Sequence, residues 1–173
     1  MTARSGQAVD LPDDSPLRGL GGRPTLVVFL RSFGCTFCRE AMADVAAAKL
    51  AIRDAGANIA FVHGASSIEA ARWFAKYDLD DVMAVSDPDL AHYAAFGLGK
   101  ASTAALINPR VWSRGAMCAL SHGFGMQPAE MLRQLPGVFL MHGDRIVAEF
   151  RHRTGADRPD YVALVRGADS AVR

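Results

Sequence analysis

The feature that most constrains the fold is a short apolar segment that leads directly into a pair of cysteines. Residues 25–30 read TLVVFL, a continuous apolar run of the kind found in strands buried on both faces. Cys35 and Cys38 follow, and apolar side chains then recur at helical spacing from residue 36 to about residue 55. A second apolar run at 58–63 completes a pattern of strand, long helix and strand, which predicts a βαβ unit with parallel strands.

The two cysteines are therefore expected in the first turn of a helix. The unpaired backbone N–H groups and the positive end of the helix dipole stabilise a thiolate at that position. Cysteines so placed titrate at roughly 3.5 to 7.5 instead of about 8.5, and the thiolate is the form that attacks disulfides and peroxides. We expect Cys35, which is nearer the helix start, to be the more exposed sulfur and the attacking thiolate in disulfide exchange. Cys38 would then resolve the mixed disulfide.

Size, charge and cysteine content narrow the class of protein. The chain has 173 residues, half of them hydrophobic, which suits one well-buried domain. Its 19 Lys and Arg nearly balance its 18 Asp and Glu, so we expect neither a nucleic-acid partner nor a membrane partner. No apolar run approaches the ~20 residues of a membrane span or forms a signal peptide, which predicts a cytoplasmic protein. With three cysteines in a reducing compartment, redox or metal chemistry is expected rather than a disulfide framework.

The remaining sequence completes an α/β pattern. We expect residues 1–24 to be an irregular lead-in and residues 25–168 to form the domain, with an insertion at about 98–135. This order of elements resembles the thioredoxin fold, an α/β fold with a central mixed β-sheet flanked by helices on both faces. The further elements expected are helices at about 67–77, 89–96, 110–120, 127–134 and 157–165, a strand at 80–85, and a hairpin of 138–142 with 146–150.

Residues 29–40, FLRSFGCTFCRE, resemble the active-site segment of peroxiredoxin-like thiol proteins related to selenoprotein L. These proteins belong to the alkyl hydroperoxide reductase and thiol-specific antioxidant superfamily. The resemblance extends to residues 135–141 and 151–160. It implies a thioredoxin-like domain whose two cysteines cycle between dithiol and disulfide while reducing a peroxide or a disulfide. It further implies that no cofactor is needed, that a thiol such as thioredoxin or glutathione donates the electrons, and that the chain can form a homodimer.

This segment also departs from ordinary peroxiredoxins. Their peroxide-reacting cysteine follows a Thr by three positions and a Pro by seven, so the resemblance places it at Cys38, with Cys35 and Arg31 at the Thr and Pro positions. Under this interpretation the roles reverse, because Cys38 becomes a sulfenic acid that Cys35 condenses with. The superfamily's Arg ahead of the late strand is replaced by Leu135 and Pro136, for which Arg31 and Arg133 are candidate substitutes. The sequence leaves both assignments open.

Several neighbours of the pair are candidates for stabilising the thiolate or contacting substrate. A cation within ~4 to 6 Å favours a thiolate, and Arg31 comes just past the buried strand, where a surface role is less expected. Gly34, Thr36 and Phe37 lie in the same segment, and Phe37 could exclude water as a wall of the site. We interpret Arg39 as a solvated helix residue.

Pro136 is a candidate of a different kind. By resemblance it corresponds to the cis-Pro that faces the cysteines in thioredoxin folds. The alternative is an ordinary trans Pro at the start of a strand.

A zinc site is the competing hypothesis. Cys35 and Cys38 together with Cys118 and His122 have the ligand count of a tetrahedral zinc site, which would make the chain a non-catalytic metal-binding or structural module. Structural zinc pairs usually lie on tight turns, whereas this pair leads from a buried strand into a long helix, as redox pairs do. Cys118 alone is most simply a small buried hydrophobe. We interpret the other histidines, His152 among them, as structural or surface residues.

Overall fold

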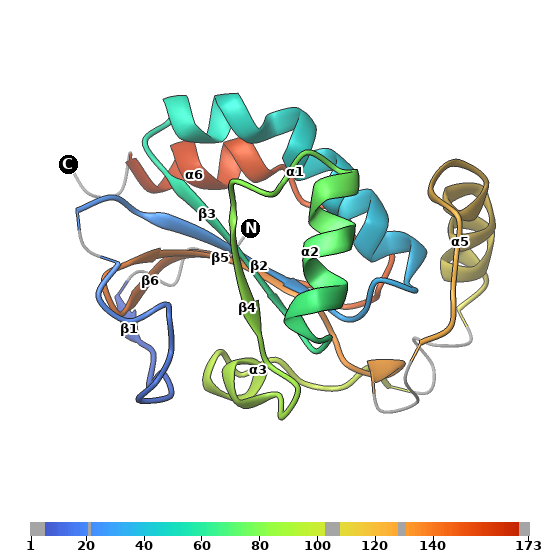
Figure 1. The fold of residues 1–173 in the computed structure, drawn as a ribbon, viewed down its shortest axis with the longest axis horizontal. Helices are drawn as coiled ribbons and strands as arrows, with labels where there is room; N and C mark the ends of the chain where they lie inside the picture. Colours follow the sequence, from blue (N-terminus) through green and yellow to red (C-terminus); the bar gives the residue numbers. More distant parts are fainter. Residues whose placement is uncertain (1–5, 21, 103–107, 128–130, 170–173) are drawn as a thin grey trace.

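A mixed six-stranded sheet forms the centre of the computed structural model, which describes residues 6–20, 22–102, 108–127 and 131–169 (Figure 1). The strand order is β1-β6-β5-β2-β3-β4. The strands β2, β3 and β4 run parallel, and the pairs β2–β5, β5–β6 and β1–β6 are antiparallel. This arrangement confirms the predicted mixed sheet of a thioredoxin-like α/β fold. The strands are β1 Gln7–Ala8, β2 Thr25–Leu30, β3 Asn58–His63, β4 Met83–Ser86, β5 Gly137–His142 and β6 Arg145–Arg151.

The predicted βαβ unit is confirmed. Strand β2 is buried along its whole length, and helix α1 (Thr36–Asp54) connects it to β3, which pairs with it in parallel register from Thr25 opposite Asn58. Gly56, just after the helix, has a φ of +87°, a conformation that glycine adopts without strain. Because β2 is central, it delivers the residues that follow it to the start of α1 in the middle of the molecule.

Helices cover both faces of the sheet. Helices α1, α2 (Ser67–Lys76) and α6 (Tyr161–Asp169) pack on one face, while α3 (Ala91–Ala95) and the N-terminal segment pack on the other. Alternate residues of β2 point to opposite faces, as the twofold repeat of a strand requires, so Val28 belongs to the first core and Phe29 to the second. Both cores therefore pack against β2, the strand that precedes the cysteines.

The N-terminal lead-in is more ordered than the sequence predicts. Within residues 6–20, β1 extends the sheet by pairing with β6, and Leu11 and Leu17 are buried in the second core. An edge strand of two residues carries too little periodicity to be recognised in a sequence.

Several predicted elements have different bounds in the structure; the helix expected at 157–165, for example, is α6, Tyr161–Asp169. The strand expected at 80–85 is β4, Met83–Ser86. The helix expected at 89–96 is α3, Ala91–Ala95, where the Asp87 carboxylate accepts the backbone N–H groups of Ala91 (3.0 Å) and His92 (2.9 Å). Of the helix expected at 127–134, residues 128–130 lie outside the described residues. Met131 is in 3-10 conformation, the Gln134 N–H donates to its carbonyl oxygen at 3.2 Å, and Gln134 then forms an isolated bridge with Lys100, so the chain makes a turn here and no α-helix runs through 131–134.

Helix α5 (Pro109–His122) confirms the helix predicted near 110–120, and the Asn108 side chain caps it by accepting the N–H of Arg110 at 3.0 Å. In Figure 1 it lies away from the sheet, beside the beginning of α1. Trp112, Met117 and Leu120 on this helix are largely exposed. Among the described residues, no helix has the length and apolar character needed to cross a bilayer.

Candidate active site

The cysteine pair lies at the N-terminal end of α1. Cys35 is the N-cap residue with an extended backbone, and Cys38 lies in the first turn, where its N–H donates to the Cys35 carbonyl oxygen at 3.1 Å. The Cys35 side chain does not cap the helix, so its sulfur is left to interact with other groups. Both cysteines are free thiols. The strand-to-helix geometry thus places both sulfurs where the sequence predicts them.

Arg31 contacts both sulfurs. Its Nη2 donates to Cys35 Sγ at 2.9 Å, and its backbone N–H donates to Cys38 Sγ at 3.3 Å. Its Nη1 donates to the carbonyl oxygen of Leu132 at 3.1 Å, which fixes the guanidinium. Arg31 is only 9% exposed, and a buried cation needs a compensating negative charge. A thiolate at Cys35, whose sulfur lies 2.9 Å from Arg31 Nη2, provides that charge.

The pKa values of the two thiols are shifted in opposite directions. A hydrogen bond from the Cys38 thiol, together with the Arg31 charge, lowers the pKa of Cys35 to about 5 in spite of burial. The same interaction and complete burial raise the pKa of Cys38 above its ordinary value. At neutral pH the site therefore holds a Cys35 thiolate and a protonated Cys38.

Both sulfurs are buried, so the expectation that Cys35 is the more exposed cysteine is wrong. Cys35 is 1% exposed and Cys38 is 3% exposed. The segment after α5 lies directly on the loop before Cys35, where the Gly125 N–H donates to the Gly34 carbonyl oxygen at 2.8 Å. A Cβ at Gly34 would lie 2.0 Å from the Met126 carbonyl oxygen. Only a glycine at position 34 permits this approach, and the contact is between segments far apart in the sequence.

A narrow pocket reaches the pair from the side of Cys38. Its cavity volume is about 20 Å³, enough for roughly one water-sized molecule. Gly155 lies in the pocket wall beside Arg31, and a Cβ there would lie 2.7 Å from Arg31 Nη2. The residues beside Cys38 that line it include polar and charged groups (Arg31, Glu40, Asp44, His152, Asp157, Arg158) and apolar ones (Phe37, Pro136, Val138, Tyr161).

His152 is a pocket residue that the sequence interpretation assigned to a structural or surface role. Both ring nitrogens are buried and have no hydrogen-bond partner among the described residues. Burial, helped by the Arg31 charge and opposed by Asp157, lowers the pKa of His152 to about 4. A neutral imidazole with two unused nitrogens therefore faces the cavity beside Cys38. Its position directly after β6, inside the segment 151–160, was the only sequence signal for it.

The other predicted site residues divide into two groups. Phe37 and Pro136 line the pocket, and the peptide bond before Pro136 is trans, so the cis assignment is wrong. Pro136 precedes β5, where a trans Pro at a strand start is ordinary. Thr36 is not among the pocket residues; its carbonyl oxygen accepts from Cys118 Sγ at 3.6 Å. Arg133 donates to the Ala101 carbonyl oxygen at 3.1 Å and is not among the pocket residues either.

Arg39 is not the solvated helix residue that the sequence suggests. It is 8% exposed, its Nε donates to the Phe33 carbonyl oxygen at 2.7 Å, and its guanidinium lies 4.4 Å from the centre of the Trp73 ring. Its Nη1 donates to the His122 carbonyl oxygen at 3.1 Å. Arg39 thereby joins the end of α5 to the loop that carries the cysteines.

The four-residue zinc set is not brought together. In the described part of the chain, the ligand atoms of Glu40, Cys118 and His122 form the only group of three or more such residues close enough to hold a metal ion. Cys118 and His122 are thus neighbours of Glu40 rather than partners of Cys35 and Cys38. Glu40 was not considered as a ligand because its pairing depends on how α5 packs against α1.

The sheet order, the helices on both faces and the dithiol at the start of α1 define a thioredoxin-like fold. No protein-family sequence model and no curated protein sequence matches the chain. Solved structures do match: reduced Prx3 of Vibrio vulnificus in complex with hydrogen peroxide has a TM-score of 0.68 at 14% identity, with 99% of each chain covered. Peroxiredoxin Q of Xanthomonas campestris has a TM-score of 0.55 at 19% identity, over 88% of this chain and 77% of that one. A peroxiredoxin-like protein of Aquifex aeolicus has a TM-score of 0.57 at 13% identity, over 87% and 75%. The chain shares the peroxiredoxin-like thioredoxin fold.

Proposed function

We propose that this protein is a peroxiredoxin-like thiol oxidoreductase in which Cys35 and Cys38 cycle between dithiol and disulfide. The observation that carries the proposal is the contact of Arg31 Nη2 with Cys35 Sγ at 2.9 Å, in a pair whose interaction lowers the pKa of Cys35. A charge-assisted hydrogen bond and a thiol hydrogen bond both stabilise a thiolate. The pair therefore has an activated nucleophile and a protonated second thiol already in place.

The reaction follows from these protonation states. The Cys35 thiolate attacks the distal oxygen of a hydroperoxide, the O–O bond breaks, and the departing alkoxide takes up a proton to leave as an alcohol. Cys35 becomes a sulfenic acid. The Cys38 thiol then attacks the Cys35 sulfur, an S–S bond forms, and water leaves. Two electrons from a thiol donor such as thioredoxin or glutathione restore the dithiol.

Burial favours a small peroxide over a protein disulfide as the substrate. A protein disulfide must bring its sulfur within bonding distance of Cys35, which is 1% exposed. The pocket beside Cys38 has room for a molecule near the size of water. The matched Prx3 structure holds hydrogen peroxide, and the bacterioferritin comigratory protein of Xanthomonas campestris is described for alkyl peroxide reduction. Hydrogen peroxide or a small alkyl hydroperoxide is the substrate class that we propose.

The opposite order of attack has one observation in its favour. The pocket is lined by Cys38 and not by Cys35, which suits the peroxidatic role that the resemblance gives to Cys38. The raised pKa of Cys38 argues against it, because a protonated thiol is a poor nucleophile. Cys35 is therefore the attacking residue in our proposal.

Stopped-flow oxidation of the reduced protein tests the function. Hydrogen peroxide and ethyl hydroperoxide should oxidise it far faster than they oxidise free cysteine, and Cys118→Ser, assayed with chelator present, should match the wild type. A rate equal to that of free cysteine would refute the peroxidase assignment.

The order of attack is tested by trapping. In Cys38→Ser a sulfenic acid on Cys35 should be captured by dimedone and located by mass spectrometry. Capture on Cys38 in Cys35→Ser, with none on Cys35 in the reciprocal variant, would assign the attacking role to Cys38. Turnover with a thioredoxin system and with glutathione, measured separately, identifies the donor.

We also propose that the protein works in a reducing compartment and forms a homodimer. A dithiol that must be re-reduced by a cellular thiol fits a reducing compartment such as the cytoplasm. A homodimer is expected from the resemblance, and light scattering of the purified protein measures it directly.

A further inference from the structure

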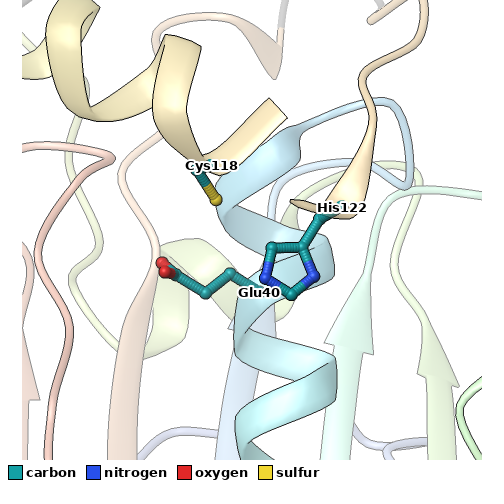
Figure 2. Close-up of side chains that lie close together, drawn as sticks. All are labelled: Glu40, Cys118 and His122. Carbon is teal, nitrogen blue, oxygen red and sulfur yellow. The ribbon is translucent and has the colours of Figure 1, made fainter. Parts of the chain in front are cut away.

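A second cluster of reactive side chains lies next to the dithiol but does not include it. One ligand atom from each of Glu40, Cys118 and His122 lies within 4.8 Å of the other two (Figure 2). Cys118 and His122 are four residues apart on α5 and so share one face of that helix. Glu40 faces them from α1. Two helices therefore converge on one point with a sulfur, an imidazole and a carboxylate.

The three donor atoms are of the kinds that bind zinc in proteins. Zn²⁺ is bound by cysteine sulfur, histidine nitrogen and carboxylate oxygen, usually in a tetrahedron. Three protein ligands leave a fourth position for water or another ligand. Cys118 is buried, while Glu40 and His122 are half-buried, so the cluster is reachable from solvent.

The surroundings hold the three side chains in place. Arg114 Nη2 donates to Glu40 Oε2 at 2.6 Å, and the Arg39 guanidinium donates to the His122 carbonyl oxygen at 3.1 Å. Such contacts behind the ligands orient them and are typical of metal sites. Within the described residues, no hydrogen bond engages the ring nitrogens of His122, which leaves them available to a metal. Glu40 balances the charge of Arg114, and the second negative charge arises only when the metal displaces the proton of the Cys118 thiol.

We propose that Glu40, Cys118 and His122 form a zinc site that fastens α5 to α1. On binding, the Cys118 S–H bond breaks, an S–Zn bond forms, and the proton is released to solvent, with no change in oxidation state. The consequence is structural, because residues 123–126 directly follow α5 and lie on Gly34, one residue before Cys35. Zinc would therefore stabilise the cover of the dithiol while leaving both of its sulfurs uncoordinated.

Zinc titration of chelator-treated, reduced protein against a chromophoric chelator tests the site. The wild type should bind one Zn²⁺ per chain. Glu40→Gln, Cys118→Ser and His122→Ala should each weaken binding by at least tenfold, since even an outer contact costs about 10–100-fold. His142→Ala, which changes an exposed histidine on β5, is the matched control and should bind as the wild type does.

The Cys35→Ser/Cys38→Ser double variant separates this site from the dithiol. Its single remaining cysteine is Cys118. It should still bind Zn²⁺, and with Co²⁺ it should give a sulfur-to-cobalt absorption band and the visible bands of a tetrahedral ion. This cobalt measurement tests the site even if the Cys118→Ser variant fails to fold. Loss of binding in the double variant, or unchanged binding in all three ligand variants, would overturn the proposal without touching the peroxidase assignment.

Discussion

The guanidinium of Arg31 lies 2.9 Å from the sulfur of Cys35, and each residue is less than a tenth exposed. This pairing joins the first residue after β2 to the N-cap residue of α1. The hydrogen bond from Cys38 and the charge of Arg31 together lower the pKa of Cys35 to about 5 in spite of burial.

Replacing Arg31 with methionine should raise the pKa of Cys35 by about 1 to 3 units, because a cation at contact distance is lost. The measurement is the rate of alkylation of the reduced protein as a function of pH, with the modified cysteine located by mass spectrometry. Arg39→Met is the matched control, since Arg39 is equally buried and contacts neither sulfur. An unchanged midpoint in Arg31→Met would show that the guanidinium does not stabilise the thiolate.

The reduced protein should become more stable between pH 7 and pH 9. The pKa of Cys35 is about 5 in the folded state and 9.0 as its ordinary value. A group whose pKa is lower in the folded protein than in the unfolded protein stabilises the fold. This stabilisation is complete above the unfolded-state pKa and is lost as the pH falls through the folded-state pKa. His152, with its pKa near 4 against an ordinary 6.5, titrates below this window.

Urea unfolding at several pH values, with a reductant present, measures this dependence. In Cys35→Ser the rise between pH 7 and pH 9 should disappear, and it should also be absent from the disulfide form of the wild type. A rise that persists in Cys35→Ser would assign the pH dependence to another group.

Gly155→Ala should raise the pKa of Cys35 without removing any charge. The new Cβ would lie 2.7 Å from Arg31 Nη2 and 3.1 Å from its Cζ, so the guanidinium must move away. pH-dependent alkylation measures the effect. Gly99→Ala is the control, because nothing lies within 4 Å of its Cβ position, and it should leave the pKa of Cys35 unchanged.

Gly34→Ala should destabilise the protein by about 1–3 kcal/mol, the usual cost of forcing extra atoms into packed structure. Its Cβ would meet the Met126 carbonyl oxygen at 2.0 Å, which is backbone and cannot rotate aside. Urea unfolding gives the free-energy change, and hydrogen exchange should show faster opening of residues 123–126. Stability equal to that of Gly99→Ala would mean that the segment after α5 does not cover the loop in solution.

Much of the fold could be predicted because its signals are local. The apolar run at 25–30 and the helical repeat after Thr36 are properties of consecutive residues, and they specify β2 and α1. The hairpin of β5 and β6 was predicted in the same way, from two apolar runs around Gly143. The short strand β1 was missed, since it exists only through its pairing with β6.

The candidate site was predicted only in part, for a corresponding reason. The placement of Cys35 and Cys38 at the start of a helix follows from their place after a strand. The burial of both sulfurs does not, because they lie in the first core with side chains from distant segments, and Gly125 and Met126, some ninety positions away, lie on Gly34 beside Cys35. The enclosure of Arg39 by Trp73 and the end of α5 was hidden from the sequence for the same reason.

By itself, the sequence determined that a buried strand would lead two cysteines to the beginning of a long helix, because alternation and periodicity act along the chain. Only the tertiary structure decided how those sulfurs are enclosed, that Arg31 Nη2 meets Cys35, and that Glu40 faces Cys118 and His122. Solvent exposure and charge pairing depend on which distant segments pack together, and that packing is settled by the burial of the whole core rather than by any local pattern.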